Sequence, residues 1–153
     1  MKKTAMLSAV VWALLQGAPV FAAGVEVTQA QMRATAEGQG LGICFVTLRS
    51  QEPVRLVGAE SPASRAVVLH EMRKTGIVLG MEKIDSMALP AGETVQLQAG
   101  GNHLMLDHLK YQLVAGAKVP LTLNFVDATG HAFSEKVEAD VVPRVRVENE
   151  DDH

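Results

Sequence analysis

Histidine and methionine side chains gather in three stretches of this sequence, the densest of which is GGNHLMLDHL at residues 100–109. Imidazole nitrogen and thioether sulfur are both metal donors, and a neutral thioether favours a soft monovalent ion such as copper(I) over zinc or calcium. These residue types therefore indicate a candidate copper(I) site. The residues concerned are His70 and Met72, then Met81 and Met87, then His103, Met105 and His108.

Strand geometry sorts the residues of the densest stretch. The run HLMLDHL is typical of a β-strand, in which residues i and i+2 share a face. His103 and Met105 then point to one side, while Leu104 and Leu106 point to the other. In a regular strand His108 falls on the leucine side, which separates it from the other two.

The stretch HEMRKTGIVLGM predicts a β-hairpin that would supply the remaining donors. A two-residue turn at Thr75-Gly76 would place His70 directly opposite Met81, with Cβ atoms about 4.5–5.5 Å apart. The same register sets Met72 opposite Leu79 on the same face. This pairing depends on the position of the turn, since a one-residue error would break it.

Two pairs of donors thus result, His70 with Met81 and His103 with Met105. If the pairs meet in space, the site holds two imidazoles and two thioethers. Four neutral ligands leave the +1 charge of copper(I) uncompensated, which suits an ion that must later be released. The alternative is that each Met fills the core and each His lies at the surface, and the residue types alone leave this open.

Residues close to these four are assigned structural roles. We expect Met72 to cover the site, with a spare thioether on the ligand face, able to bind a second copper, as the alternative. Met87 is expected in the core or at its rim, and Asp107 as a solvated carboxylate rather than a group that orients an imidazole. His108 and His131 are expected at the surface.

The elements that must position the donors are all predicted to be β-strands. Short apolar runs alternate with Gly, Pro, Asn and Asp at roughly ten-residue spacing, which favours a single-domain antiparallel sandwich or barrel. The predicted strands are Leu41–Leu48, Val54–Ser61, Arg65–Met72, Gly76–Ile84, Glu93–Gly100, His103–Leu109, Val119–Ala128 and His131–Val142. The double glycine before His103 is interpreted as a bend that brings this residue to the hairpin.

The two ends of the chain have different compositions from the domain. Residues 1–22 combine two lysines, an apolar run and small residues before Ala22, which predicts an export signal peptide cleaved near that residue. The apolar run is too short to span a membrane, and no cysteine follows it that would carry a lipid anchor. The mature domain is expected at 23–143, followed by an acidic, disordered tail at 144–153.

The net charge excludes two classes of binding partner, and the cysteine count excludes an internal disulfide. The net charge is −3, and removal of Lys2 and Lys3 with the signal peptide makes it −5, which argues against nucleic acid and anionic membranes as partners. Cys44 is the only cysteine, so the domain has no internal disulfide, and we expect this side chain to be a small buried hydrophobe.

Common catalytic motifs are missing. HEMRK begins like a zinc-protease helix, but Lys74 stands where H-E-x-x-H requires its second histidine, and the sequence has no G-x-S-x-G and no Walker motif. A blue-copper electron carrier needs His and Met close to its Cys ligand, and neither follows Cys44 within several residues. The sequence predicts a binding protein rather than an enzyme.

The donor spacing H-x10-M-x21-H-x-M resembles that of the periplasmic copper(I) chaperones of the PCuAC family. The flanks RLVGAESPAS, ALPAGETVQLQAGGNHLMLDHLK and LVAGAKVPLTLNF are similar to the family's framework as well. The resemblance covers Val54 to Val142 and, more loosely, a strand from Met32 to Leu48. Ala99 replaces a common Pro, Met32 replaces a common aromatic, and the tail offers only His153 where some members carry several His and Met.

The resemblance implies a cupredoxin-like β-sandwich that binds Cu(I) through His70, Met81, His103 and Met105. It also implies a periplasmic protein that delivers copper to the CuA centre of cytochrome c oxidase, directly or with a Sco-type protein. Two alternatives remain, a periplasmic copper buffer for detoxification and a copper-independent secreted β-sandwich that serves as an interaction module.

Overall fold

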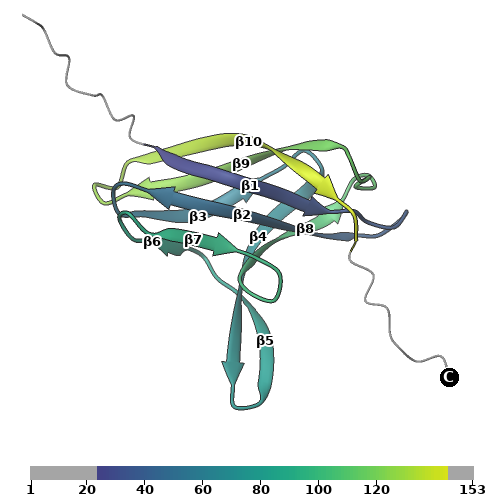
Figure 1. The fold of residues 1–153 in the computed structure, drawn as a ribbon, viewed down its shortest axis with the longest axis horizontal. Coiled ribbons are helices and arrows are strands. Elements are labelled where there is room, and N and C mark those ends of the chain that lie inside the picture. Colours follow the sequence, from purple (N-terminus) through teal and green to yellow (C-terminus); the bar gives the residue numbers. More distant parts are fainter. Residues whose placement is uncertain (1–23, 145–153) are drawn as a thin grey trace, which may run out of the picture.

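The computed structural model describes residues 24–144, which fold into ten β-strands (Figure 1). The predicted signal peptide at 1–22 and positions 145–153 of the predicted tail lie outside the described residues. The strands are β1 (Val25–Arg33), β2 (Leu41–Ser50), β3 (Val54–Glu60), β4 (Ser64–Thr75), β5 (Val78–Lys83), β6 (Met87–Leu89), β7 (Thr94–Leu97), β8 (His103–Leu109), β9 (Lys118–Asp127) and β10 (Ala132–Val142). The all-β prediction is confirmed.

Hydrogen bonds join nine strands into one strongly curved sheet in the order β5-β4-β8-β2-β1-β10-β9-β3-β6, and the tenth strand, β7, pairs with β2 beside this path. An additional β3–β4 pairing, Ala59 opposite Val67, connects distant positions of this order and closes the body into a flattened, two-layered shape (Figure 1). β1 and β10 pair in parallel, which is a departure from the predicted antiparallel arrangement, whereas the other strand pairs are antiparallel.

The core forms because apolar residues alternate along the strands. In β8, Leu104 and Leu106 are fully buried, and in β9 the buried positions are every second residue. Fully burying a side chain of this size stabilises the fold by about 1.5–3 kcal/mol. The inward positions of β9 are Val119, Leu121, Leu123 and Phe125. The body of the domain is thus held together by apolar packing that uses none of the four predicted metal donors.

The loosely similar strand from Met32 to Leu48 is in fact two strands. Met32 lies near the end of β1, and β2 begins at Leu41. Between them Gly38 adopts a φ of +74°, and Gln39 N donates a hydrogen bond to Ala36 O. A left-handed glycine in a hydrogen-bonded turn ends an extended run, which explains the break.

The β4–β5 hairpin forms as predicted but in a different register. The turn residues are Gly76 and Ile77, so His70 lies opposite Lys83 and Met72 lies opposite Met81, and the predicted direct pairing of His70 with Met81 is wrong. Gly76 has a φ of +65° at the first central position, which fits a type II′ turn. The predicted turn would have placed a β-branched Thr there, a residue that avoids positive φ.

The shift changes partners but not faces. Moving a turn by one residue moves each cross-strand partner by two, and side chains alternate with a period of two. Met81 therefore stays on the face of His70 and becomes its diagonal neighbour. The hairpin projects away from the body of the molecule (Figure 1). Within the residues that the structure describes, no helix is long and apolar enough to cross a membrane.

Candidate metal centre

Two histidines on neighbouring strands form the centre of the candidate site. His70 of β4 and His103 of β8 are directly opposed in the antiparallel ladder. Their rings meet edge to face, with centroids 5.4 Å apart and planes at 76°. The sequence did not predict this pairing, because it depends on the strand with which β8 pairs, and β4 is not adjacent to β8 in the sequence.

A backbone carbonyl fixes the protonation of His103. Its Nδ1 lies 3.0 Å from Gly101 O, and a carbonyl oxygen can only accept a hydrogen bond, so a proton must sit on Nδ1. In the neutral ring the lone pair is then on Nε2. That atom is buried and has no hydrogen-bond partner among the described residues, and the side chain is only 6% exposed. In a metal-binding histidine one ring nitrogen donates to an acceptor such as this carbonyl, and the other carries the free lone pair that binds the metal.

His70 supplies a second free nitrogen. Its Nδ1 is also buried without a partner in the described part of the chain. Burial lowers the pKa of His70, and the nearby His103 and Lys83 lower it further. The neutral ring, whose lone pair can bind a metal, is therefore favoured. An unsatisfied buried polar atom costs about 1–3 kcal/mol, and a ligand bound by these two nitrogens would offset that cost.

The two thioethers flank the imidazole pair at opposite corners. Met105 shares a face with His103, lies opposite Val68 of β4, and is half-buried. Met81 lies on β5, on the far side of His70, and is 57% exposed. The structure thus brings the histidines into contact and places one methionine on each side, rather than closing all four residues into one cluster. Binding by these four residues stays a prediction.

The described chain has no second candidate metal site built from the more common metal-binding side chains. Residues 24–144 contain no group of three or more His, Cys, Asp or Glu side chains that could hold a metal ion.

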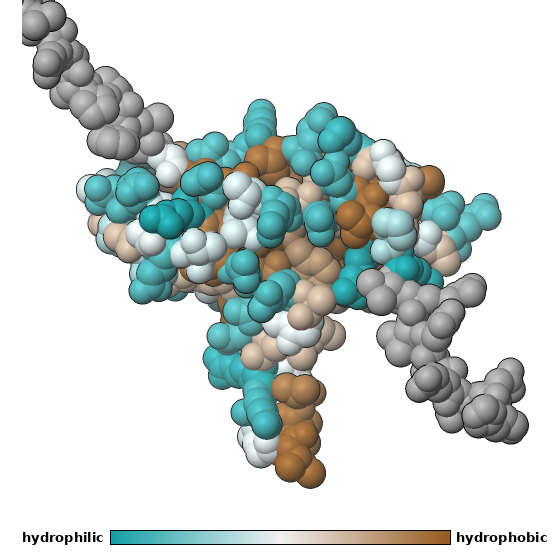
Figure 2. All heavy atoms as spheres, viewed as in Figure 1, coloured by the Kyte–Doolittle hydropathy of each residue, from teal (hydrophilic) through white to brown (hydrophobic). Residues whose placement is uncertain are grey.

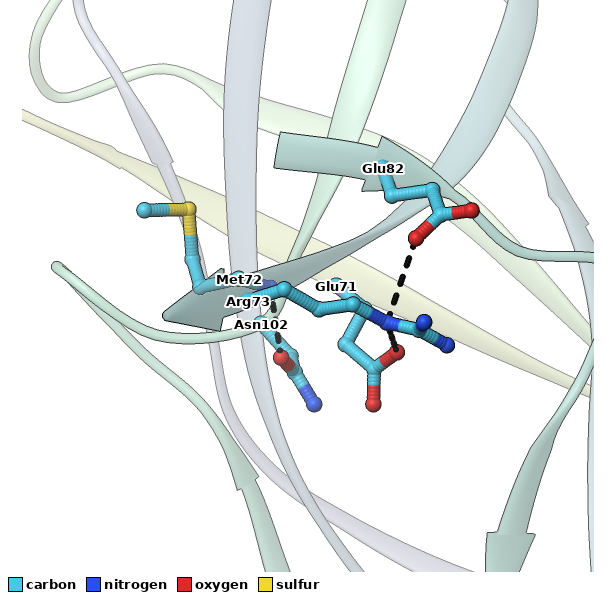
Figure 3. Close-up of polar contacts among 5 residues, drawn as sticks. All are labelled: Glu71, Met72, Arg73, Glu82 and Asn102. Carbon is cyan, nitrogen blue, oxygen red and sulfur yellow. Dashed lines mark hydrogen bonds and ion pairs between the residues drawn. The ribbon is translucent and has the colours of Figure 1, made fainter. Parts of the chain in front are cut away.

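The double-glycine loop connects the two halves of the site. Gln98 N donates to Asn102 O, and Gly101 N donates to Gln98 O, which folds the chain tightly between β7 and β8. Gly100 has a φ of +76°, a conformation that favours glycine. Besides Gly101 O on His103, the loop offers Asn102 Oδ1, which accepts a hydrogen bond of 3.0 Å from Met72 N of the hairpin (Figure 3).

The predicted bend is therefore present, and it does more than place His103, since it also ties the loop to the hairpin. Sequence reasoning missed Asn102 and the Gly101 carbonyl. A backbone acceptor has no side-chain signal, and Asn after Gly-Gly indicates only a turn.

The two faces of the hairpin differ in chemistry. On one face Arg73 Nε lies 3.0 Å from Glu71 Oε2 and 3.1 Å from Glu82 Oε2. The Met72 side chain leaves β4 on the other side (Figure 3). Both carboxylates are thus engaged by Arg73 away from the donor face, which carries His70, Met72 and Met81.

The tip of the hairpin is apolar and exposed, as the brown patch in Figure 2 shows. Ile77 is 98% exposed, and Val78 and Leu79 are exposed as well. Exposed apolar side chains in a contiguous group are typical of an interaction site. Of these side chains, Leu79 shares its face of β5 with the exposed Met81.

The structure confirms the predictions for Met87, His108, His131, Asp107 and Cys44, while the role of Met72 stays a prediction. Met87 is buried, and His108 and His131 are exposed. Asp107 does not orient His103, since its Oδ1 lies 3.1 Å from His108 Nδ1 at the surface. Cys44 is fully buried in β2, and burial raises the pKa of its thiol to about 12.

Comparison with known sequences gives a family. Residues 25–140 match the LpqE-like family, described as "Putative lipoprotein LpqE-like". A relative from Leifsonia xyli subsp. xyli, "Putative lipoprotein Lxx21020", is 36% identical over 107 residues. The match covers 69% of this chain and 64% of the length of that relative.

Comparison with solved structures gives the fold. The "Copper-bound PCuAC domain from PmoF2" aligns with a TM-score of 0.63 at 22% identity and covers 81% of this chain and 97% of that domain. The solution structure of "CuI-DR1885" from Deinococcus radiodurans aligns with a TM-score of 0.57 at 29% identity, over 85% of this chain and 83% of that chain. The predicted cupredoxin-like fold is confirmed.

Proposed function

Because the chain belongs to the LpqE-like family, and its PCuAC-type resemblance is thereby confirmed, we propose that it is an exported Cu(I)-binding chaperone that acts in the periplasm. Copper is its cargo, bound through His70, Met81, His103 and Met105. Family membership also makes the chain a binding module rather than an enzyme, as the sequence predicts. We further propose that it delivers copper to the CuA centre of cytochrome c oxidase, directly or through a Sco-type protein.

One observation carries the proposal. Two imidazoles contact each other, each with a buried, unpartnered nitrogen, and a thioether lies on either side of them. Imidazole binds both Cu(I) and Zn(II), but the two soft thioethers favour Cu(I), because Zn(II) prefers thiolate, imidazole or carboxylate ligands and Ca(II) prefers oxygen. The solved relative from Deinococcus radiodurans, described as CuI-DR1885, is consistent with that choice.

The position of Met81 supports release as well as binding. Its exposed sulfur lies on β5 beside the apolar tip of the hairpin. An acceptor protein could cover this tip, exclude water and offer its own ligand to the ion. A site used only for storage gains nothing from such an exposed ligand.

A conservative variant tests the site. In His103→Asn, the side-chain amide can still donate to Gly101 O but provides no Nε2 lone pair. Loss of a hydrogen bond to a metal ligand costs about 10–100-fold in affinity, so loss of the ligand itself should weaken Cu(I) by at least about 100-fold. Competition with a chromophoric Cu(I) chelator measures this, with His131→Asn at an exposed histidine as the matched control.

Unchanged Cu(I) affinity in His103→Asn would overturn the proposed site. Delivery is tested separately, by mixing the Cu(I)-loaded protein with the apo CuA domain of an oxidase subunit and following the absorption of the assembled centre. Retention of copper by the loaded protein would instead favour the copper-buffer alternative.

A further inference from the structure

Met72 is not explained by the four-residue site, although its register places it among the donors. It lies directly opposite Met81 in the β4–β5 ladder and two residues along β4 from His70, on the same face. If the β4–β8 register is continued by two residues beyond the His70–His103 pair, Met72 lies opposite Gly101, two residues before His103. His103 is therefore a diagonal neighbour of Met72. Met72 is therefore a direct neighbour of Met81 in the sheet. Met105 is farther from Met81, because the His70–His103 pair lies between them.

The backbone hydrogen bonds bring Met72 and Met81 close together. In an antiparallel ladder, the N–H and C=O of one residue point to the same neighbouring strand. The Met72 N–H points to Asn102, on the β8 side, so Met72 and Met81 form a non-hydrogen-bonded pair. Such pairs have the shorter Cα separation, about 4.5 Å, and their side chains are in closest contact.

The charges around Met72 favour a soft ion over a hard one. Glu71 and Glu82 both bind Arg73 on the opposite face of the hairpin (Figure 3). The donor face near Met72 instead carries neutral imidazole and thioether groups, with Lys83 opposite His70. Met72 is half-buried and flexible, so its sulfur can reach an ion held between the histidines.

We propose that Met72 is a fifth copper donor, which with Met81 forms an outer thioether pair that competes with Met105 for the ion held by His70 and His103. This inference rests on the proposed function and adds a path for release. As Cu(I) moves outward, the bond to the Met105 sulfur breaks and a bond to the Met72 sulfur forms. The ion keeps its +1 charge and oxidation state throughout, and it ends beside the exposed Met81, where an acceptor can reach it.

Methionine-to-leucine variants test the inference with little effect on folding, since the exchange nearly conserves volume. The set is Met72→Leu, Met105→Leu, the double variant, and Met87→Leu as a control at a buried methionine of β6. Cu(I) affinity is measured by chelator competition, and X-ray absorption counts the sulfur neighbours of the ion.

If Met72 binds copper, each single variant loses about tenfold in affinity, because the other methionine replaces the lost donor, and the double variant loses far more than the sum of the two effects. Met105→Leu keeps two sulfur neighbours, and the double variant keeps one. Met87→Leu matches the wild type in both measurements.

If the double variant equals Met105→Leu in affinity and sulfur count, Met72 only covers the site and the inference is overturned while the proposed function stands. A wild-type protein that binds no Cu(I) would overturn the proposed function itself, and the inference with it.

Discussion

Asn102 illustrates how a single side chain outside the donor set can control the site. Its Oδ1 accepts the hydrogen bond from Met72 N and so joins the loop before β8 to the hairpin. Asn102→Ala removes the acceptor, which should destabilise the protein by about 1 kcal/mol and, by loosening the hairpin, weaken Cu(I) by about tenfold. Urea unfolding and chelator competition measure the two effects.

Asn102→Asp is the matched control, because its carboxylate keeps an acceptor oxygen at the same place. This variant should retain most of the copper affinity. A loss of stability in Asn102→Ala with unchanged copper affinity would mean that the bond supports the fold but does not position the site.

Cys44 shows a residue whose effect is on stability and depends on pH. Burial raises the pKa of its thiol from 9.0 to about 12, so the folded state keeps the proton longer than the unfolded chain does. Above pH 9 the unfolded state ionises first, and stability falls by about 1.4 kcal/mol per pH unit until the folded thiol also ionises. Below pH 9 this contribution is fully retained.

Cys44→Ala removes this dependence, while contributions from all other groups are common to both proteins and cancel in the difference. The free energies of unfolding from urea titrations at pH 8 and pH 10.5 should therefore converge between wild type and variant as the pH rises. A constant difference would show that the buried thiol does not titrate as its surroundings indicate.

At the scale of single residues, the sequence predicted what side-chain type and alternation determine. The shared face of His103 and Met105 and the burial of Met87 follow from these two properties. Alternation alone would put His108 on the buried side of Leu104 and Leu106, and its exposure instead accompanies a φ of +54° that interrupts the regular strand. The groups that it missed act through the backbone or through a loop. Gly101 O and Met72 N have no signature in the amino-acid letters.

At the scale of elements, the β4–β5 hairpin combines a donor face with an apolar tip. If an acceptor docks on this tip, Val78→Ser should slow copper transfer to the CuA domain by an amount on the order of tenfold, since burying a valine is worth about 1.5 kcal/mol. Cu(I) affinity should stay unchanged, because Val78 lies on the face opposite to Met81. Stopped-flow absorption of the CuA centre measures the rate.

Val114→Ser is the matched control, because Val114 is similarly exposed but lies in the loop between β8 and β9, outside the hairpin. This variant should transfer copper at the wild-type rate. Equal slowing in both variants would mean that any exposed valine-to-serine exchange slows transfer, and it would contradict docking at the hairpin tip.

The hairpin also shows why faces are easier to predict than partners. The residues of the donor face depend only on the two-residue period of a strand. They are the same for the predicted turn at Thr75-Gly76 and for the observed turn at Gly76-Ile77. The pairing of His70 depends on the turn type and on the neighbouring strand. Neither is determined by the spacing of histidine and methionine.

At the scale of the whole molecule, the closure of the sheet could not be predicted from the sequence. The parallel β1–β10 pair and the β3–β4 bridge join segments that are far apart or that follow each other through a turn, and similar apolar strands could pair in other ways. The all-β class follows from local patterns instead, although β1 (Val25–Arg33) and the short β6 (Met87–Leu89) are not among the eight predicted strands. The donors lie outside the apolar core, so the fold should not require copper.

Copper should therefore stabilise an already folded protein by mass action. At free Cu(I) of about 100 times Kd, the free energy of unfolding rises by about 2.7 kcal/mol, which corresponds to an increase of roughly 10 °C in Tm for a domain of this size. Thermal unfolding under anaerobic, reducing conditions measures the shift.

Two controls accompany this measurement. His103→Asn should be folded without metal and show little shift in Tm with Cu(I). Zn(II) should give little shift in Tm with the wild type, because thioethers contribute little to the binding of Zn(II). An equal rise in Tm with Zn(II) would contradict a site built from soft donors, and an apo protein without a cooperative transition would contradict a core that folds independently of the donors.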